Sequence, residues 1–167
     1  MRPMKRISVL LADDYALFRK ALRKLLKDAE DIEVVSEAKN GREAVELTRK
    51  LHPAVVLMDI AMPLLNGLEA TRRILSALPS TKVIILSAHN DDAYVQHATE
   101  AGAVGYLLKQ APLDILPQAI REVQAGHLYF LRSIAKCLRD RKSKRNQKKW
   151  QATLFLPGAG SASLVAL

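Results

Sequence analysis

The stretch AVVLMDIAMPLLNG, residues 54–67, decides how the chain folds. It begins with five consecutive apolar residues, which is too short a run for a helix and contains no polar interruption. Such a run is typical of a strand that is buried on both faces of a parallel sheet. Asp59 follows directly, at the point where an open α/β sheet places its ligands. Asp59 is therefore the first candidate for a reactive group.

The segment after Asp59 predicts a rigid loop rather than an incidental one. Pro63 fixes its own φ angle, and Asn66 and Gly67 supply turn residues before the next helical pattern. An aspartate at a strand end is more often a helix cap or a solvated loop residue, so Asp59 alone does not establish chemistry. The ends of other strands have to supply its partners.

Length and composition favour one ordinary domain with a tail. The chain has 167 residues, and its hydrophobic fraction of 49% is enough to build a core. The single cysteine, Cys137, offers neither an internal disulfide nor metal-ligand spacing, which favours a reducing compartment. The first apolar run, residues 7–12, is too short for a signal peptide or a membrane span. We therefore expect a cytoplasmic protein that has no membrane partner.

The net charge of +9 is concentrated in the tail. Residues 1–131 contain 17 Lys and Arg against 16 Asp and Glu, a net charge of +1. Residues 132–167 contain 9 basic residues against 1 acidic residue, a net charge of +8. The globular part is therefore not a nucleic-acid binder on charge grounds.

Short apolar runs and helical patterns alternate along the chain. The predicted strands are residues 7–12, 32–38, 54–58, 82–86 and 104–108. The helical pattern after the first strand has basic residues, Arg19 among them, on its expected outer face. A last helix is predicted over residues 112–125, where Pro117 leaves two alternatives. Either Asp114 caps the helix and Pro117 lies in its first turn, or the helix is kinked at Pro117.

Five strands that alternate with five helices predict an α/β fold with a doubly wound, five-stranded parallel sheet. The flavodoxin-like strand order 2-1-3-4-5, with helices on both faces, is the natural one for this count. This order brings the carboxyl ends of four strands to one edge of the sheet. The polar residues at those ends are Asp13, Asp14, Asp59, Ser87 and Lys109.

Three carboxylates that lie close together repel one another, and a hard divalent cation such as Mg²⁺ relieves that repulsion. Because Mg²⁺ commonly binds phosphate oxygens as well, the expected guest is a phosphoryl group. Asp59 could accept it as an aspartyl phosphate, while Lys109 and Ser87 stabilise its charge. The alternatives are a helix cap for the acid pair, a turn for Ser87 and a surface charge for Lys109.

The four motifs LLADD, LMDIAMPLLNG, VIILSAH and GAVGYLLK together resemble the receiver domain of bacterial two-component response regulators. The stretch ILSAHNDDAYVQHATEAGAVGYLLK is similar to the LuxR-type (NarL/FixJ) branch, and the resemblance covers residues 5–138. It implies a signalling domain rather than an enzyme, with a sensor histidine kinase as the phosphodonor. It also implies control of self-association and, in the family, regulation of transcription.

The resemblance assigns roles position by position. Asp59 would be the phosphoacceptor, and Ser87 and Lys109 would contact the phosphoryl group. The ligands of Mg²⁺ would be Asp13, Asp14, Asp59 and the backbone carbonyl of Ala61. Tyr106 occupies the place of an aromatic switch residue that responds to Ser87, although a buried core aromatic is the alternative.

The C-terminal part departs from the family pattern. LuxR-type regulators usually carry a helix-turn-helix domain after a linker, and DNA binding would depend on that domain, for which this chain has no room. Residues 1–130 are expected to form the receiver domain, and residues 131–167 a flexible basic tail that begins with a helical continuation. The composition of the tail indicates a truncated or frame-shifted gene end, a hypothesis that sequencing the parent locus would test.

Two other function classes fit the residues less well. An aspartate-nucleophile phosphatase generally has a second acid two residues after the nucleophile, and here that residue is Ala61. A flavin-binding or DNA-binding module would need a phosphate-binding loop or a recognition helix, and neither pattern is present.

Overall fold

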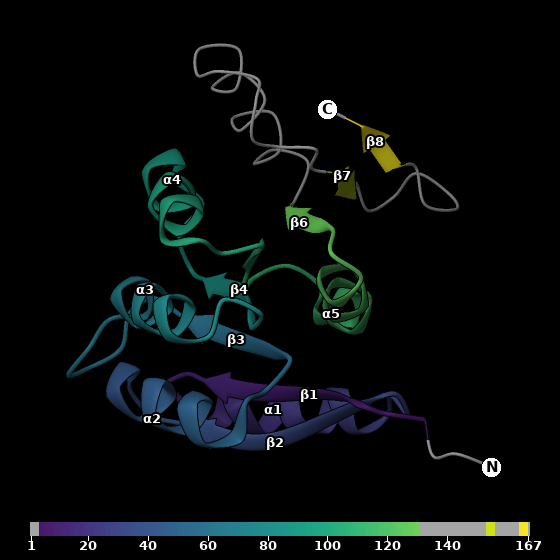
Figure 1. Ribbon diagram of the computed structural model, residues 1–167, viewed down its shortest axis with the longest axis horizontal. Helices are drawn as coiled ribbons and strands as arrows, with labels where there is room; N and C mark the ends of the chain where they lie inside the picture. Colours follow the sequence, from purple (N-terminus) through teal and green to yellow (C-terminus); the bar gives the residue numbers. More distant parts are fainter. Residues whose placement is uncertain (1–3, 131–152, 156–163, 167) are drawn as a thin grey trace.

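The computed structural model describes residues 4–130, 153–155 and 164–166 of the chain (Figure 1). The strands are β1 (Ile7–Ala12), β2 (Ile32–Ala38), β3 (Val55–Asp59), β4 (Lys82–Ser87), β5 (Gly105–Leu108), β6 (Leu128–Phe130), β7 (Thr153–Phe155) and β8 (Leu164–Ala166). The helices are α1 (Ala16–Lys27), α2 (Gly41–Leu51), α3 (Gly67–Ala77), α4 (Asp92–Ala101) and α5 (Leu116–Gln124), and a 3₁₀ turn, η1, spans Leu113–Ile115.

The strands form one sheet in the order β2-β1-β3-β4-β5-β6-β7-β8. Its first five members have the predicted order and are parallel, so the predicted α/β fold is confirmed. The sheet continues beyond the predicted edge, because β6 pairs in parallel with β5 through Gly105 and Tyr129. Three residues are too few to show a period in the sequence, which is why β6 was not predicted.

The two outer strands lie within the segment predicted to be a flexible tail. β7 pairs in parallel with β6, and β8 pairs antiparallel with β7. The rest of that segment, including the helical continuation predicted after residue 130, lies outside the described residues.

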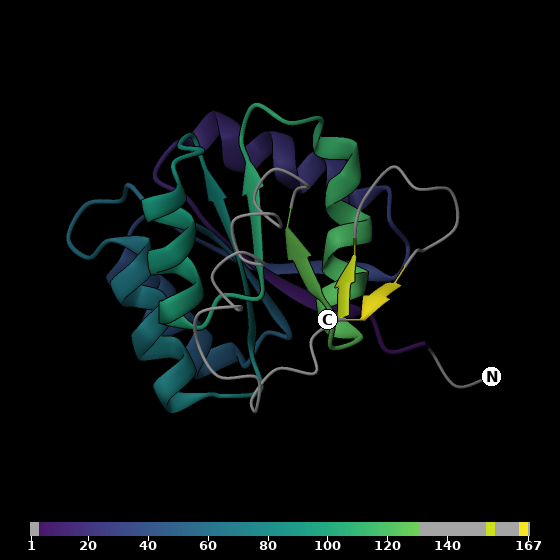
Figure 2. The same cartoon turned by 90° about the horizontal axis from the view of Figure 1, so that it is seen from above.

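Helices cover both faces of the sheet and create two hydrophobic cores. The core on one face contains Ala44 of α2, Ile74 of α3 and Val95 of α4. The core on the other face contains Leu22 of α1 and Ile120 of α5. Figure 2 shows the same division, with α4 and α5 on opposite sides of the central strands. The central strands are apolar along their whole length because both of their faces are covered.

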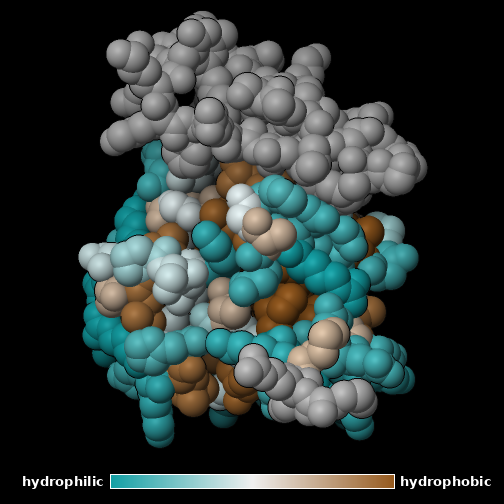
Figure 3. All heavy atoms as spheres, turned by 45° about the vertical axis from the view of Figure 1, so that its right-hand side comes forward, coloured by the Kyte–Doolittle hydropathy of each residue, from teal (hydrophilic) through white to brown (hydrophobic). Residues whose placement is uncertain are grey.

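Hydrophilic side chains cover most of the described surface that is visible in Figure 3. Within the described part of the chain, no helix combines the length and the apolar composition that crossing a bilayer requires.

The structure agrees with neither alternative for the last helix in full. Pro117 lies in the first turn of α5, where its missing N–H group costs no helical hydrogen bond. Asp114 is not the cap of α5, because it lies in the preceding 3₁₀ turn and α5 has no side-chain cap.

Arg19 corrects the prediction for α1. Its side chain is not on the solvated face with its basic neighbours but is buried, with a residue exposure of 7%. One guanidinium nitrogen, Nη1, donates to the backbone carbonyl of Asp13 at 2.5 Å. Arg19 therefore ties the first turn of α1 to the end of β1.

Candidate functional site

Each polar residue predicted for the sheet edge lies at a strand end in the structure. Asp13 and Asp14 follow β1, Asp59 is the last residue of β3, Ser87 is the last residue of β4, and Lys109 follows β5. In the strand register, Asp59 is level with Leu86 and Ser87 is level with Leu108. Because the strands are parallel neighbours, these ends lie at the same edge of the sheet.

Three carboxylates meet at this edge. One oxygen each from Asp13, Asp14 and Asp59 lies within 4.8 Å of the others. Asp13 and Asp59 are buried, with residue exposures of 2% and 6%, whereas Asp14 is exposed. Oxygen ligands at this spacing, with one side open to solvent, suit a hard divalent cation that keeps several of its waters. The residues therefore fit the magnesium site that the sequence predicts.

Lys109 joins two of the three acids. Its ammonium nitrogen lies 2.6 Å from Oδ2 of Asp13 and 3.3 Å from Oδ1 of Asp59. The lysine side chain has an exposure of only 21%, so the alternative of a simple surface charge is wrong. Its ammonium also lies over the ring of Phe18, 4.7 Å from the ring centroid.

The electrostatics of the site act most strongly on Asp59. Burial, followed by the charge of Asp13, raises the pKa of the Asp59 carboxyl from 3.8 to about 6, although Lys109 opposes the shift. Burial alone would lower the pKa of Lys109, but its hydrogen bond to Asp13 and the charge of Asp59 raise it overall. At neutral pH the site therefore holds an ionised Asp59 that lacks sufficient positive charge around it. A bound cation would supply that charge.

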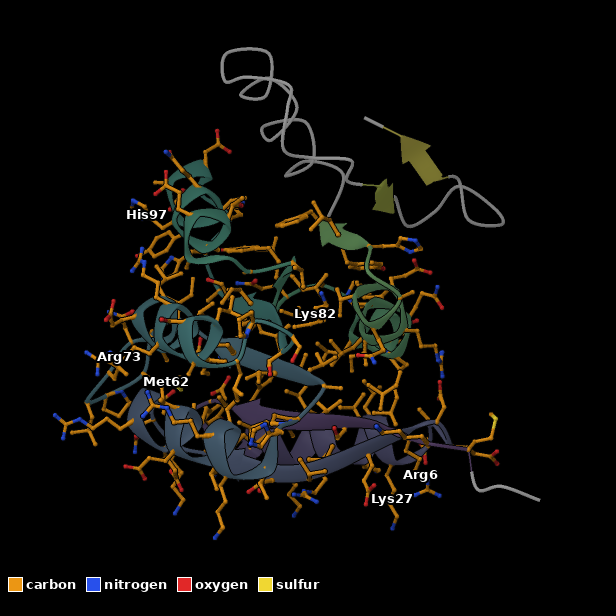
Figure 4. All side chains as sticks on the ribbon, viewed as in Figure 1. Arg6, Lys27, Met62, Arg73, Lys82 and His97 are labelled. Atoms are coloured by element: carbon orange, nitrogen blue, oxygen red, sulfur yellow. The ribbon has the colours of Figure 1, made fainter. Side chains whose placement is uncertain are left out.

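The loop after Asp59 folds back against the end of β3. The N–H group of Gly67 donates to the carbonyl of Ile60 at 2.9 Å, and Asn66 caps α3 by accepting from the N–H of Glu69. A Cβ atom at Gly67 would overlap the carbonyl oxygen of Asp59, so only glycine allows this close return. Met62, in the same loop, lies between α3 and α2 (Figure 4).

Ser87, His89 and Tyr106 form a hydrogen-bonded group beside the acids. Ser87 Oγ accepts a hydrogen bond from the backbone N–H of His89 at 3.0 Å. The Tyr106 ring is fully buried, and its hydroxyl donates to the carbonyl of His89 at 2.6 Å. Tyr106 is thus a core aromatic, as the alternative held, but its hydroxyl is also bound to the loop between β4 and α4. That loop follows directly on Ser87.

The remaining predicted features divide as follows. The acid pair is not the cap of α1, because the cap position is Tyr15 and Asp13 Oδ1 accepts from its backbone N–H at 2.8 Å. Ala61 lies in the loop two residues after Asp59, and the role of its carbonyl stays a prediction. His97 is exposed and projects outward from α4 (Figure 4).

Sequence reasoning missed two residues that support the site. Arg19 holds the backbone of Asp13, and Phe18 contacts the ammonium of Lys109. Both lie in the first turns of α1, where they appear as ordinary members of an amphipathic pattern. Only their contacts with the strand ends in the folded chain distinguish them from the other residues of α1.

Comparison with known proteins agrees with this geometry. Residues 9–121 match the family described as the response regulator receiver domain. The chain belongs to this family. Transcriptional regulatory protein DegU of Brevibacillus brevis is 43% identical over 125 residues, which are 75% of this chain and 53% of that protein. Response regulator GacA of Pseudomonas aeruginosa is 42% identical over 132 residues, 79% of this chain and 62% of that protein.

Solved structures of receiver domains have the same fold. A LuxR-family two-component response regulator from Aurantimonas sp. SI85-9A1 has a TM-score of 0.76 at 31% identity and covers 83% of this chain and 99% of that one. The signal receiver domain of NarL from Mycobacterium tuberculosis has a TM-score of 0.71 at 32% identity, covering 74% and 99%. The chain spans between half and two thirds of the length of DegU and GacA.

Proposed function

We propose that this receiver domain accepts a phosphoryl group on Asp59 from a histidine-phosphorylated sensor kinase and thereby changes its self-association. The observation that carries the proposal is the meeting of three carboxylates with one ammonium. The acid oxygens lie within 4.8 Å of one another, and Lys109 Nζ lies 3.3 Å from Asp59 Oδ1. This arrangement combines a nucleophile, a cation site and a fixed positive charge.

In the proposed reaction an oxygen of Asp59 attacks the phosphorus of the phosphohistidine. A phosphorus–oxygen bond forms as the phosphorus–nitrogen bond breaks, and the electron pair stays on the imidazole nitrogen, which takes up a proton from solvent. Lys109 stabilises the negative charge that develops on the phosphoryl oxygens. The nucleophile has to be ionised, and a pKa of about 6 leaves Asp59 mostly ionised at neutral pH.

Asp13, Asp14, Asp59 and the carbonyl of Ala61 are the proposed ligands of Mg²⁺. The bound ion would supply positive charge for the phosphoryl oxygens. Asp13 is also the closer partner of Lys109, at 2.6 Å against 3.3 Å for Asp59, so it contacts both the lysine and the proposed cation. The open side next to the exposed Asp14 leaves an entrance for both the cation and the donor.

Apolar side chains around the site support a protein as the natural donor. Tyr15 and Leu17 at the start of α1 are 59% and 64% exposed, and Leu64 in the loop after β3 is 69% exposed. Both segments begin at the strand ends that carry the acids. A contiguous exposed apolar patch next to a polar site is typical of a protein-binding surface. We propose that the kinase contacts these residues.

Ser87 and Tyr106 are the proposed route from the site to the surface. When Ser87 turns toward the phosphoryl group, it gives up its contact with the N–H of His89, and the loop held by Tyr106 moves with it. That loop leads into α4, so the surface formed by α4, β5 and α5 would change. In this family the output is usually transcription regulation, and we propose that the changed surface serves that output.

Intact-mass measurement after incubation with acetyl phosphate and Mg²⁺ tests the assignment. We expect the wild-type chain to gain the mass of one phosphoryl group, and Asp59→Asn to gain none. Asp31→Asn is the matched control, since it makes the same chemical change in an exposed carboxylate at the other end of the sheet, and it should behave as wild type. Full incorporation into Asp59→Asn would reject Asp59 as the acceptor.

Size-exclusion chromatography before and after phosphorylation tests the consequence for self-association. We expect an earlier elution volume only for the phosphorylated wild-type chain. An unchanged elution volume would contradict the proposed output while leaving the phosphoacceptor assignment in place.

A further inference from the structure

We propose that Phe18 is a positioning residue for phosphoryl transfer, because the face of its ring holds the Lys109 ammonium beside Asp59. This inference rests on the function proposed above. The ammonium nitrogen lies 4.7 Å from the ring centroid, which is within the range of a cation–π interaction. The negative face of an aromatic ring attracts a cation without adding a formal charge or accepting its proton.

The ring is well placed to act as a fixed support. Phe18 lies in the first turn of α1 and packs, partly buried, against the hydrophobic core between α1 and α5. Leu113 and Ile115 of the 3₁₀ turn pack against the same core. Packing against this core limits how far the ring can move.

The carboxylates and the ring together restrict the position of Lys109. Lys109 has a long, flexible stem, and its ammonium has three donors. The carboxylates of Asp13 and Asp59 attract it at 2.6 and 3.3 Å, and the ring contacts it at 4.7 Å. A movement of the stem toward solvent would break the contact with Asp13 and also the contact with the ring. The ring therefore adds to the cost of that movement.

The support matters most when the charge at Asp59 is redistributed. After transfer, the negative charge lies on the phosphoryl oxygens rather than on the carboxylate, and Lys109 has to follow that charge. Asp13 competes for the same ammonium, whereas Phe18 attracts it without competing as an anion. The ring can therefore keep the ammonium near the site while the lysine changes its anionic partner.

Variants at position 18 separate the ring face from simple packing. Phe18→Leu keeps an apolar side chain but removes the ring, and Phe18→Tyr restores the ring. With acetyl phosphate and Mg²⁺, we expect the rate of mass gain to fall about threefold in Phe18→Leu, which is the size of a partly exposed cation–π contact. The rate should recover in Phe18→Tyr. Unfolding in urea shows whether each variant is folded under the assay conditions.

A double-mutant cycle with Lys109→Met tests whether Phe18 acts through the lysine. Once the ammonium is removed, Phe18→Leu should cause no further loss of rate. An equal loss in the Lys109→Met background would mean that Phe18 is only a packing residue, and would overturn the proposal. An unchanged rate in Phe18→Leu with Lys109 present would also overturn it.

Nuclear magnetic resonance tests the contact independently of phosphorylation. Protons on the ε-carbon of Lys109 should be shifted upfield by the ring in the wild-type chain and in Phe18→Tyr, but not in Phe18→Leu. If the shift is present and the wild-type chain takes up no phosphoryl group, the proposed function fails while the contact is confirmed. If the shift is absent, the contact fails whatever the phosphorylation result.

Discussion

Two aspartates in this molecule each have a cationic partner, yet their pKa values are shifted in opposite directions. Asp59 lies 3.3 Å from Lys109 at the carboxyl edge of the sheet, and its pKa is raised to about 6, chiefly by burial. Asp31 precedes β2 at the opposite edge and binds Arg121 of α5 through two contacts of 2.7 and 2.8 Å. The hydrogen bond from Arg121 lowers the pKa of Asp31.

The difference arises from the surroundings rather than from the ion pair itself. Asp59 is buried beside two further acids, so its carboxylate loses hydration and is repelled by Asp13. The side chain of Asp31 is 38% exposed and faces a single guanidinium in a bidentate arrangement. A close cation does not show that a carboxylate is stabilised. Burial and the neighbouring acids make the ionised form of Asp59 unfavourable, as expected where a cation is to bind.

The largest expected effect is on stability when Asp59 becomes neutral. In the presence of a chelator at pH 8, Asp59→Asn should raise the free energy of unfolding by up to about 3 kcal/mol, because a pKa shift of about two units is removed. The wild-type chain loses this stability as pH rises from about 4 to about 6, because over that range the folded state binds the Asp59 proton more tightly than the unfolded state does. Urea unfolding of both proteins from about pH 4 to about pH 8 measures it.

Asp31→Asn is the contrasting variant, with an effect of the opposite sign. Because the folded-state pKa of Asp31 is lowered, its contribution is present above the ordinary value of 3.8 and is lost as pH falls through the folded-state value. The variant should therefore be slightly less stable than wild type at pH 8. If the two substitutions changed stability in the same direction, the contrast between the sites would be wrong.

Magnesium should have the next largest effect. Binding to the acids would stabilise the folded wild-type chain by about 2.7 kcal/mol at a concentration one hundred times the dissociation constant. Thermal unfolding with added Mg²⁺, and again after a chelator is added, measures this effect. Asp13→Asn should lose most of the stabilisation, and Asp31→Asn should retain all of it. Equal stabilisation of both variants would place the cation elsewhere.

The smallest effect is expected for the exposed ion pair. Arg121→Gln should lower the free energy of unfolding by about 0.2–1 kcal/mol, because both partners remain accessible to water and ions. The difference from wild type should shrink as salt is added. Urea unfolding at low and high salt measures it. A loss that is independent of salt would indicate that Arg121 contributes by packing rather than by charge.

Much of the fold could be predicted because its signals are local. A run such as residues 54–58 indicates a buried strand from its own composition, and Asn66 and Gly67 indicate the turn that follows it. The residues at the strand ends could be gathered at one edge because parallel strands share a direction. The strand β6 was not predicted, because its three residues adopt a strand only by pairing with β5.

The sequence predicted that the candidate site residues lie at one edge of the sheet, but it did not predict their contacts or electrostatics. Arg19 was expected on the solvated face of α1, and the structure buries it against the carbonyl of Asp13. Phe18 carried no signal at all, since an aromatic residue in an amphipathic helix usually belongs to a core. In both cases the decisive contact joins α1 to a strand end that helical spacing does not describe.

The sequence by itself determined the alternation of strands and helices, the identity of the polar residues at the strand ends and the family resemblance. The tertiary structure decided that Lys109 bridges Asp13 and Asp59, that Asp59 has a raised pKa, and that Phe18 faces the ammonium. The physical reason is range. Spacing along the chain encodes period and turn chemistry, whereas charge interactions depend on the distances and burial that arise when residues 96 positions apart are packed together.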